Sequence, residues 1–135
     1  MEKEDQRKLI KYWQETADHD YETMEALFHV KRYDSTLFFG HIVLEKILKS
    51  LVAKYTGEHA PYTHNLVRLA EKTSLNFSEE EMELFREVNS FNIEARYPEE
   101  RLEFYRQCTQ AYAAPYVEKI KTLYQKLCQQ SRRKE

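Results

Sequence analysis

The sequence predicts an all-α protein, an antiparallel up-and-down bundle of four long helices plus one short helix. Only 2 of its 135 residues are glycine and 3 are proline, which leaves little material for the tight turns of a sheet. Apolar residues recur at steps of three and four over long stretches, a spacing typical of helices with one buried side. The links between these stretches are short, and short links place consecutive helices side by side and antiparallel.

The first helix is expected from about Glu4 to Lys31, because an apolar stripe runs through this segment. Trp13 lies on the stripe and is interpreted as an anchor in the core. The next residues break the pattern, and Asp34 or Ser35 is a natural N-cap for a second helix.

The second helix is expected to end near Tyr55, with Gly57 suited to the left-handed cap. Between Leu37 and Val52 its apolar residues cover most of the helix circumference, so other helices or a second copy of the chain must enclose it. This surface favours a homodimer. His41 and Glu45 are one turn apart inside the apolar arc, where unpaired polar groups are costly. We interpret His41 as a structural polar residue that orients its surroundings.

The second half of the chain predicts a short helix and two long ones. Thr63 can cap a short helix over residues 64–73. Ser78 and Glu81 have the spacing of a capping box, which opens the third long helix, and that helix is expected to fade between residues 92 and 95.

The last long helix is expected to begin between Glu99 and Thr109 and to reach about Gln129. Pro115 lies inside its pattern and predicts a kink or a broken start. We therefore expect residues 1–130 to form a single helical domain, followed by a frayed polar tail over residues 131–135.

Composition narrows the possible functions. The formal net charge is −2, which makes bulk nucleic-acid binding unfavourable. The sequence contains no signal-peptide core and no apolar run long enough to cross a membrane. Its 2 cysteines lack the spacing of a disulfide framework. These features predict a cytoplasmic protein that does not enter a membrane.

Motifs for metal and nucleotide cofactors are absent from the sequence. There is no repeated Glu-x-x-His and no His-Glu-x-x-His, so we expect no metal. Two glycines do not make a phosphate-binding loop, and no Gly-x-Ser-x-Gly elbow is present. We expect no cofactor and no covalent catalysis.

A set of polar residues on the helices and at their ends remains as a candidate ligand-binding site. Such side chains can hold a phosphate, bond a sugar hydroxyl or stack on a base. Each also has a structural alternative: an internal pair, a solvated lysine, a helix cap or a helix-end contact. The candidates are Glu45, Lys46, Lys49, His64, Asn65, Asn92, Arg96 and Tyr97.

Four short patterns, taken in order, resemble the HEPN family (higher eukaryotes and prokaryotes nucleotide-binding), from about Lys11 to Cys128. They are Trp13 with Ala17 and Asp20, then His41-x-x-x-Glu45-Lys46-x-x-Lys49, then Pro61-x-Thr63-His64-Asn65-Leu66, and last Asn92-x-x-x-Arg96-Tyr97-Pro98. The resemblance implies a helical bundle, usually a homodimer, of the prokaryotic kind often paired with a minimal nucleotidyltransferase. Such pairs are regarded as toxin–antitoxin-like modules.

Many members of this family are metal-independent ribonucleases, marked by an arginine followed by a histidine after four to six residues. No histidine follows His64 in this sequence, so Arg96 has no such partner. We therefore expect a non-catalytic module that binds a nucleotide, a nucleotidyltransferase partner, or both. The alternatives are a ribonuclease toxin with an atypical active site, in which Arg96 steadies phosphate and His64 or Tyr97 moves the proton, and a purely structural oligomerisation subunit.

Overall fold

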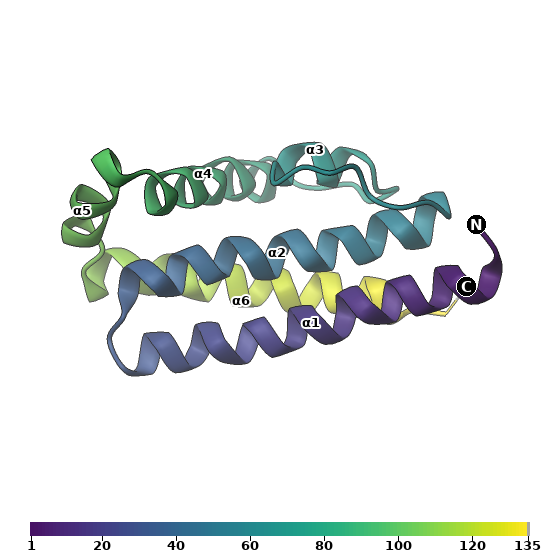
Figure 1. Cartoon of the computed structure of the whole chain (residues 1–135), viewed down its shortest axis with the longest axis horizontal. Coiled ribbons are helices and arrows are strands. Elements are labelled where there is room, and N and C mark those ends of the chain that lie inside the picture. Colours follow the sequence, from purple (N-terminus) through teal and green to yellow (C-terminus); the bar gives the residue numbers. More distant parts are fainter. Residues whose placement is uncertain (135) are drawn as a thin grey trace.

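A computed structural model of the chain describes residues 1–134, which form six helices and no strand (Figure 1). This architecture confirms the predicted all-α bundle. The helices are α1 (Lys3–His29), α2 (Tyr33–Thr56), α3 (Leu66–Glu71), α4 (Glu79–Arg96), α5 (Pro98–Gln107) and α6 (Gln110–Arg132).

Helix α2 lies in the middle of the bundle and packs against each of the other five helices (Figure 1). Helices α3 and α4 run along one side of it, and α1 runs along another. The short helix α5 lies at the end of the bundle where α1 turns into α2. No helix within residues 1–134 has both the length and the apolar character needed to cross a membrane.

The ends of two helices are as the sequence predicts. Gly57 follows α2 with a φ of 71°, the left-handed conformation that favours glycine. At the start of α4, the Ser78 hydroxyl accepts a hydrogen bond from the Glu81 backbone, and the Glu81 carboxylate accepts one from the Ser78 backbone. Both groups of the capping box are therefore in place.

Two expected helix caps are wrong. Helix α2 begins one residue before Asp34, because the Arg32 carbonyl already accepts a hydrogen bond from the Thr36 backbone N–H. Helix α3 is capped by Asn65 instead of Thr63: the Asn65 side chain accepts hydrogen bonds from the first backbone N–H groups of the helix. The Thr63 hydroxyl instead accepts a hydrogen bond from the Asn65 N–H, just before the helix.

The segment after α4 also differs from the expectation, because it forms a helix, α5, that the sequence did not predict. Pro98 is the first residue of α5, a position that needs no backbone N–H. Phe104 is the one buried side chain of α5, so the segment lacks the apolar stripe by which longer helices are recognised. Thr109 then caps α6, which is continuous through Pro115. The break expected near that proline lies instead between α5 and α6.

Helix α6 extends to Arg132, into the segment that we expected to fray, whereas Glu135 lies outside the described residues. The cause is a buried polar contact between three helices. The Ser131 hydroxyl lies 2.8 Å from the Ser50 hydroxyl of α2 and accepts a hydrogen bond of 2.8 Å from the Gln14 amide of α1. Ser131 therefore ties α1, α2 and α6 together.

The Ser131→Ala variant is expected to lose about 1 kcal/mol of unfolding free energy, because the Gln14 amide and the Ser50 hydroxyl each lose a buried partner. Chemical denaturation measures this difference. The control is Gln129→Ala, on the exposed side of the same turn, which is expected to change stability by less than about 0.5 kcal/mol. A loss of stability in Ser131→Ala as small as that in the control would show that the Ser131 contact does not hold the end of α6 in place.

Candidate functional site

A cluster of polar side chains lies where α2 meets the loop before α3, and the Glu45 carboxylate is at its centre. Its Oε1 lies 2.9 Å from His64 Nδ1, and its Oε2 accepts a hydrogen bond of 2.9 Å from Lys49 Nζ. Lys49 is one turn after Glu45 on the same face of α2, whereas His64 comes from the loop 19 residues later. The carboxylate therefore fixes the loop to the central helix.

His41 lies one turn before Glu45 and is held by the same loop. Its Nε2 lies 2.7 Å from the His64 carbonyl oxygen, and because a carbonyl can only accept, Nε2 carries the proton. Its Nδ1 lies 3.8 Å from Glu45 Oε1 and is a buried atom without a hydrogen-bond partner among the described residues. The side chain is 1% exposed, so His41 is part of the interior.

Burial and nearby charges control the ionisation of this pair. Burial lowers the pKa of His41 and outweighs the opposite effects of the Glu45 charge and of the hydrogen bond to the His64 carbonyl. The charge of Arg96 lowers the pKa of His41 further. Burial alone would raise the pKa of Glu45, but hydrogen bonds from Lys49 and His64 lower it below its usual value. The cluster therefore holds a neutral His41 beside an ionised Glu45.

The Lys49 side chain continues the cluster toward α1. Its ammonium group lies 5.1 Å from the centre of the Trp13 ring, a cation–π contact. Trp13 is partly buried there and is the one tryptophan in the sequence. The expected core anchor is thus half-buried and lies beside the site, where its fluorescence reports on it.

Arg96 and Asn92 lie toward the other end of the same face of α2. The Arg96 Nε donates a hydrogen bond of 2.9 Å to the Asn92 side-chain oxygen. The guanidinium lies 5.8 Å from the centre of the Phe38 ring, and Phe38 is one turn before His41. Arg96 itself is exposed, and Tyr97, which ends α4, is half-exposed.

Two of the predicted site residues have other roles. Lys46 forms an ion pair with Asp20 of α1, whereas the cluster residue Lys49 binds Glu45. Asn65 caps α3, and its side-chain oxygen also accepts a hydrogen bond of 3.0 Å from the Asn89 amide of α4. Asn65 therefore has the helix-capping role that was its structural alternative, and Lys46 pairs with α1 and not with the cluster.

Sequence reasoning missed Asn89 and Tyr62. Asn89 also accepts a hydrogen bond of 2.9 Å from the Leu66 N–H and so positions the start of α3. An asparagine in the middle of a helix carries no pattern that would reveal this role. Tyr62 lies beside His64, with ring centres 6.2 Å apart, and the isolated aromatic residue in a loop gave no signal.

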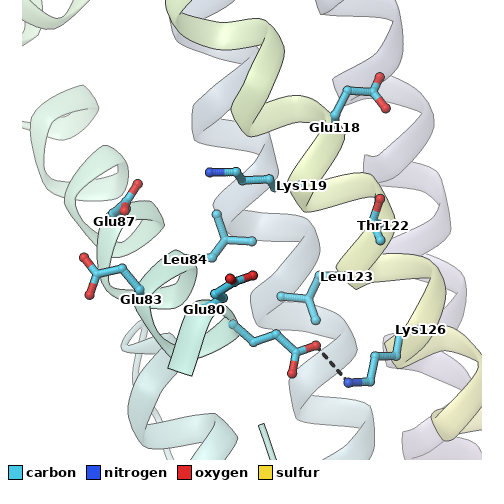
Figure 2. Close-up of a pocket in the computed structure, with 10 residues that line it drawn as sticks. Glu80, Glu83, Leu84, Glu87, Glu118, Lys119, Thr122, Leu123 and Lys126 are labelled. Carbon is cyan, nitrogen blue, oxygen red and sulfur yellow. Dashed lines mark hydrogen bonds and ion pairs between the residues drawn. The ribbon is translucent and has the colours of Figure 1, made fainter. Parts of the chain in front are cut away.

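A cleft between α4 and α6 lies elsewhere on the molecule and contains none of the predicted residues (Figure 2). Its volume is about 660 Å³. Five glutamates and two lysines line it, and the ammonium group of one lysine, Lys126, lies 2.8 Å from the Glu81 carboxylate. Because carboxylates outnumber ammonium groups, this cleft is unsuited to a ligand that carries phosphate.

Residues 10–130 match the model of the HEPN domain. The chain belongs to the HEPN family. The matched segment covers all the residues of the polar cluster around Glu45, together with the whole of α2 and α3. The resemblance carried by the sequence motifs is therefore confirmed at the level of the family.

A solved structure supports the same fold. The crystal structure of TT1696 from Thermus thermophilus matches with a TM-score of 0.77 and 18% sequence identity, over 90% of this chain and 97% of that one. At this identity the likeness extends to the fold alone. Comparison with curated proteins gives no significant match. Among residues 1–134 no group of three or more side chains is arranged to hold a metal ion.

The structure predicts that this HEPN protein loses stability as the pH falls below about 6.5, the ordinary pKa of histidine. The folded state lowers the pKa of His41, so the unfolded chain binds the proton more readily. The stabilisation is complete above about pH 6.5 and is lost as the pH falls through the pKa of folded His41. Denaturation of the wild type and of His41→Gln between pH 5 and 8 is expected to give a flatter profile for the variant. Identical slopes would contradict the buried, neutral state of His41.

Glu45→Gln is expected to lower the unfolding free energy by about 3 kcal/mol or more, because it leaves the Lys49 ammonium group buried without its counter-ion. The double variant Glu45→Gln/Lys49→Met is expected to recover part of that loss. The matched control is Glu15→Gln, which breaks the exposed Lys11–Glu15 pair at the same spacing and is expected to cost less than about 0.5 kcal/mol. A Glu45→Gln effect as small as the control would show that the cluster does not hold the loop.

Proposed function

We propose that this HEPN protein binds a nucleotide on the face where the loop before α3 meets α2, and that it does so as a non-catalytic module. The observation that supports this proposal is the presentation of His64. Its Nδ1 proton is directed at the ionised Glu45, its ring is 45% exposed, and its Nε2 has no partner among the described residues. A fixed imidazole with a free, unprotonated nitrogen is suited to accept a hydrogen bond from a sugar hydroxyl.

Two further groups on the same face support an anionic ligand. The Arg96 guanidinium is exposed and held by Asn92, and its charge acts on His41, which places it within electrostatic range of the cluster. Tyr97 follows it with a half-exposed ring. In this proposal Arg96 binds phosphate, His64 binds a sugar hydroxyl, Lys49 balances the charge of Glu45, and Glu45 and His41 hold the geometry.

The proposal includes a partner. A HEPN module without the ribonuclease signature suits a nucleotidyltransferase partner in a toxin–antitoxin-like pair. The other helices of the same chain already enclose the apolar surface of α2, so a homodimer would have to use another surface. Exposed apolar side chains at the end of α4 and on α5 support an association surface at that end: Ile93, Tyr97, Leu102 and Tyr105.

A metal-independent ribonuclease is the second candidate, and one specific observation favours it. A carboxylate that holds the Nδ1 proton of an imidazole leaves Nε2 as a proton acceptor, the arrangement used by carboxylate–histidine pairs in general-base catalysis. The His64–Glu45 pair has this arrangement, although the Arg-x(4-6)-His signature is absent.

Nucleotide binding is tested with the single tryptophan, because Trp13 contacts Lys49 of the cluster. Titration of the full chain with AMP, ATP and GTP is expected to change its fluorescence saturably. Arg96→Ala is expected to weaken binding on the order of tenfold, the value of one hydrogen bond to a charged group, and His64→Ala by about fivefold, the value of one between neutral groups. Lys46→Ala, whose partner is Asp20, is the control and is expected to bind as the wild type does.

Calorimetry alongside the titration decides between the candidates. Absence of binding for every nucleotide, by both methods, would contradict nucleotide binding and favour the purely structural subunit. Incubation of the protein with RNA in the presence of a chelator separates the enzyme from the binding module: no cleavage is expected. Cleavage of RNA by the wild type that is lost in His64→Ala would contradict the non-catalytic binding module and support the ribonuclease.

A further inference from the structure

The loop between α2 and α3 presents one aromatic side chain almost completely to solvent. Tyr62 is 96% exposed, well above the other large apolar side chains on the surface, which are 51–60% exposed. Its ring makes a single aromatic contact, with the neighbouring His64. Neither packing nor a hydrogen bond within the described residues accounts for its position.

The loop that carries Tyr62 is fixed at both ends. After Gly57, the Thr56 hydroxyl accepts a hydrogen bond of 3.1 Å from the Glu58 N–H. At the other end His64 is held twice, by its carbonyl oxygen on His41 and by its ring on Glu45. Tyr62 is two residues before that double anchor. These anchors therefore hold the backbone of Tyr62 in a defined place, which lowers the entropy lost on binding a ligand.

The Tyr62 and His64 rings lie side by side at the edge of the proposed site. Their centres are 6.2 Å apart and their planes make an angle of 56°. The outer face of the Tyr62 ring is open to solvent, and the free Nε2 of His64 lies next to it. A flat heteroaromatic group placed on Tyr62 would bring an attached sugar to His64.

We propose that Tyr62 is the stacking platform for the base of the bound nucleotide, with a hydroxyl of the sugar donating a hydrogen bond to His64 Nε2. This inference rests on the proposed nucleotide binding and adds to it the position of the base. Stacking on one aromatic face accepts any base, because every base has a π-face, and it favours the larger purines. The subsite therefore takes purine nucleotides more tightly than pyrimidine nucleotides.

The test compares AMP with ribose 5-phosphate, which has the same sugar and phosphate but no base. Trp13 fluorescence and calorimetry measure binding to the wild type, Tyr62→Ala and Tyr62→Phe. For AMP, Tyr62→Ala is expected to weaken binding on the order of tenfold, whereas Tyr62→Phe keeps the stacking face and the affinity. For ribose 5-phosphate, measured by competition, the three proteins are expected to bind equally. UMP is expected to bind the wild type more weakly than AMP.

Tyr105→Ala is the matched control, since Tyr105 is an exposed tyrosine on α5, and it is expected to leave AMP binding unchanged. Wild-type affinity of Tyr62→Ala for AMP would overturn the stacking proposal and leave nucleotide binding intact. If Tyr62→Ala lost as much affinity for ribose 5-phosphate as for AMP, the stacking proposal would also be overturned. Tyr62 would then affect binding through the conformation of the loop and not through contact with the base. Absence of AMP binding to the wild type would overturn both proposals.

Discussion

The burial of α2 is the constraint on which the rest of this structure depends. Its residues Ile47 to Ala53 are all buried, and it packs against each of the other five helices. A charged group on such a helix needs a partner inside the bundle, since an unpaired buried charge is costly. Glu45 meets this requirement with Lys49 and His64, and in doing so it brings the loop before α3 onto the helix. The candidate site is a consequence of how a central helix accommodates its charged residues.

The sequence predicted the helices that bury a continuous stripe and missed the one that does not. Four long helices appear where apolar spacing placed them, but α5 buries only Phe104 and has no stripe to detect. The Ser78–Glu81 box was predictable because both capping bonds are local. The burial of Ser131 was not, since it depends on Ser50 and Gln14, which are far away in the sequence.

The same distinction holds for the site. Glu45 and Lys49 were predictable as one face of a helix, because a spacing of four residues fixes their direction. Lys46 follows Glu45 directly and so lies on a different face of the helix, where it pairs with Asp20 of α1. The spacing reveals the difference in face but not which neighbouring helix each face meets. Tyr62 gave no signal because its position depends on a loop held by His41 and Glu45, a tertiary contact that local patterns do not encode.

The His64 carbonyl holds the proton of His41 on Nε2, and Glu45 holds the proton of His64 on Nδ1. The two histidines are therefore opposite tautomers, and Nε2 of His64 is left free at the site. Long-range proton–nitrogen correlation NMR of the imidazole rings at about pH 8 tests this arrangement directly, because a histidine is neutral well above its ordinary pKa. His41 is predicted to carry its proton on Nε2, with a bare Nδ1, and His64 is predicted to carry a proton on Nδ1. A proton on Nδ1 of His41, or a bare Nδ1 on His64, would contradict this arrangement and with it the proposed site.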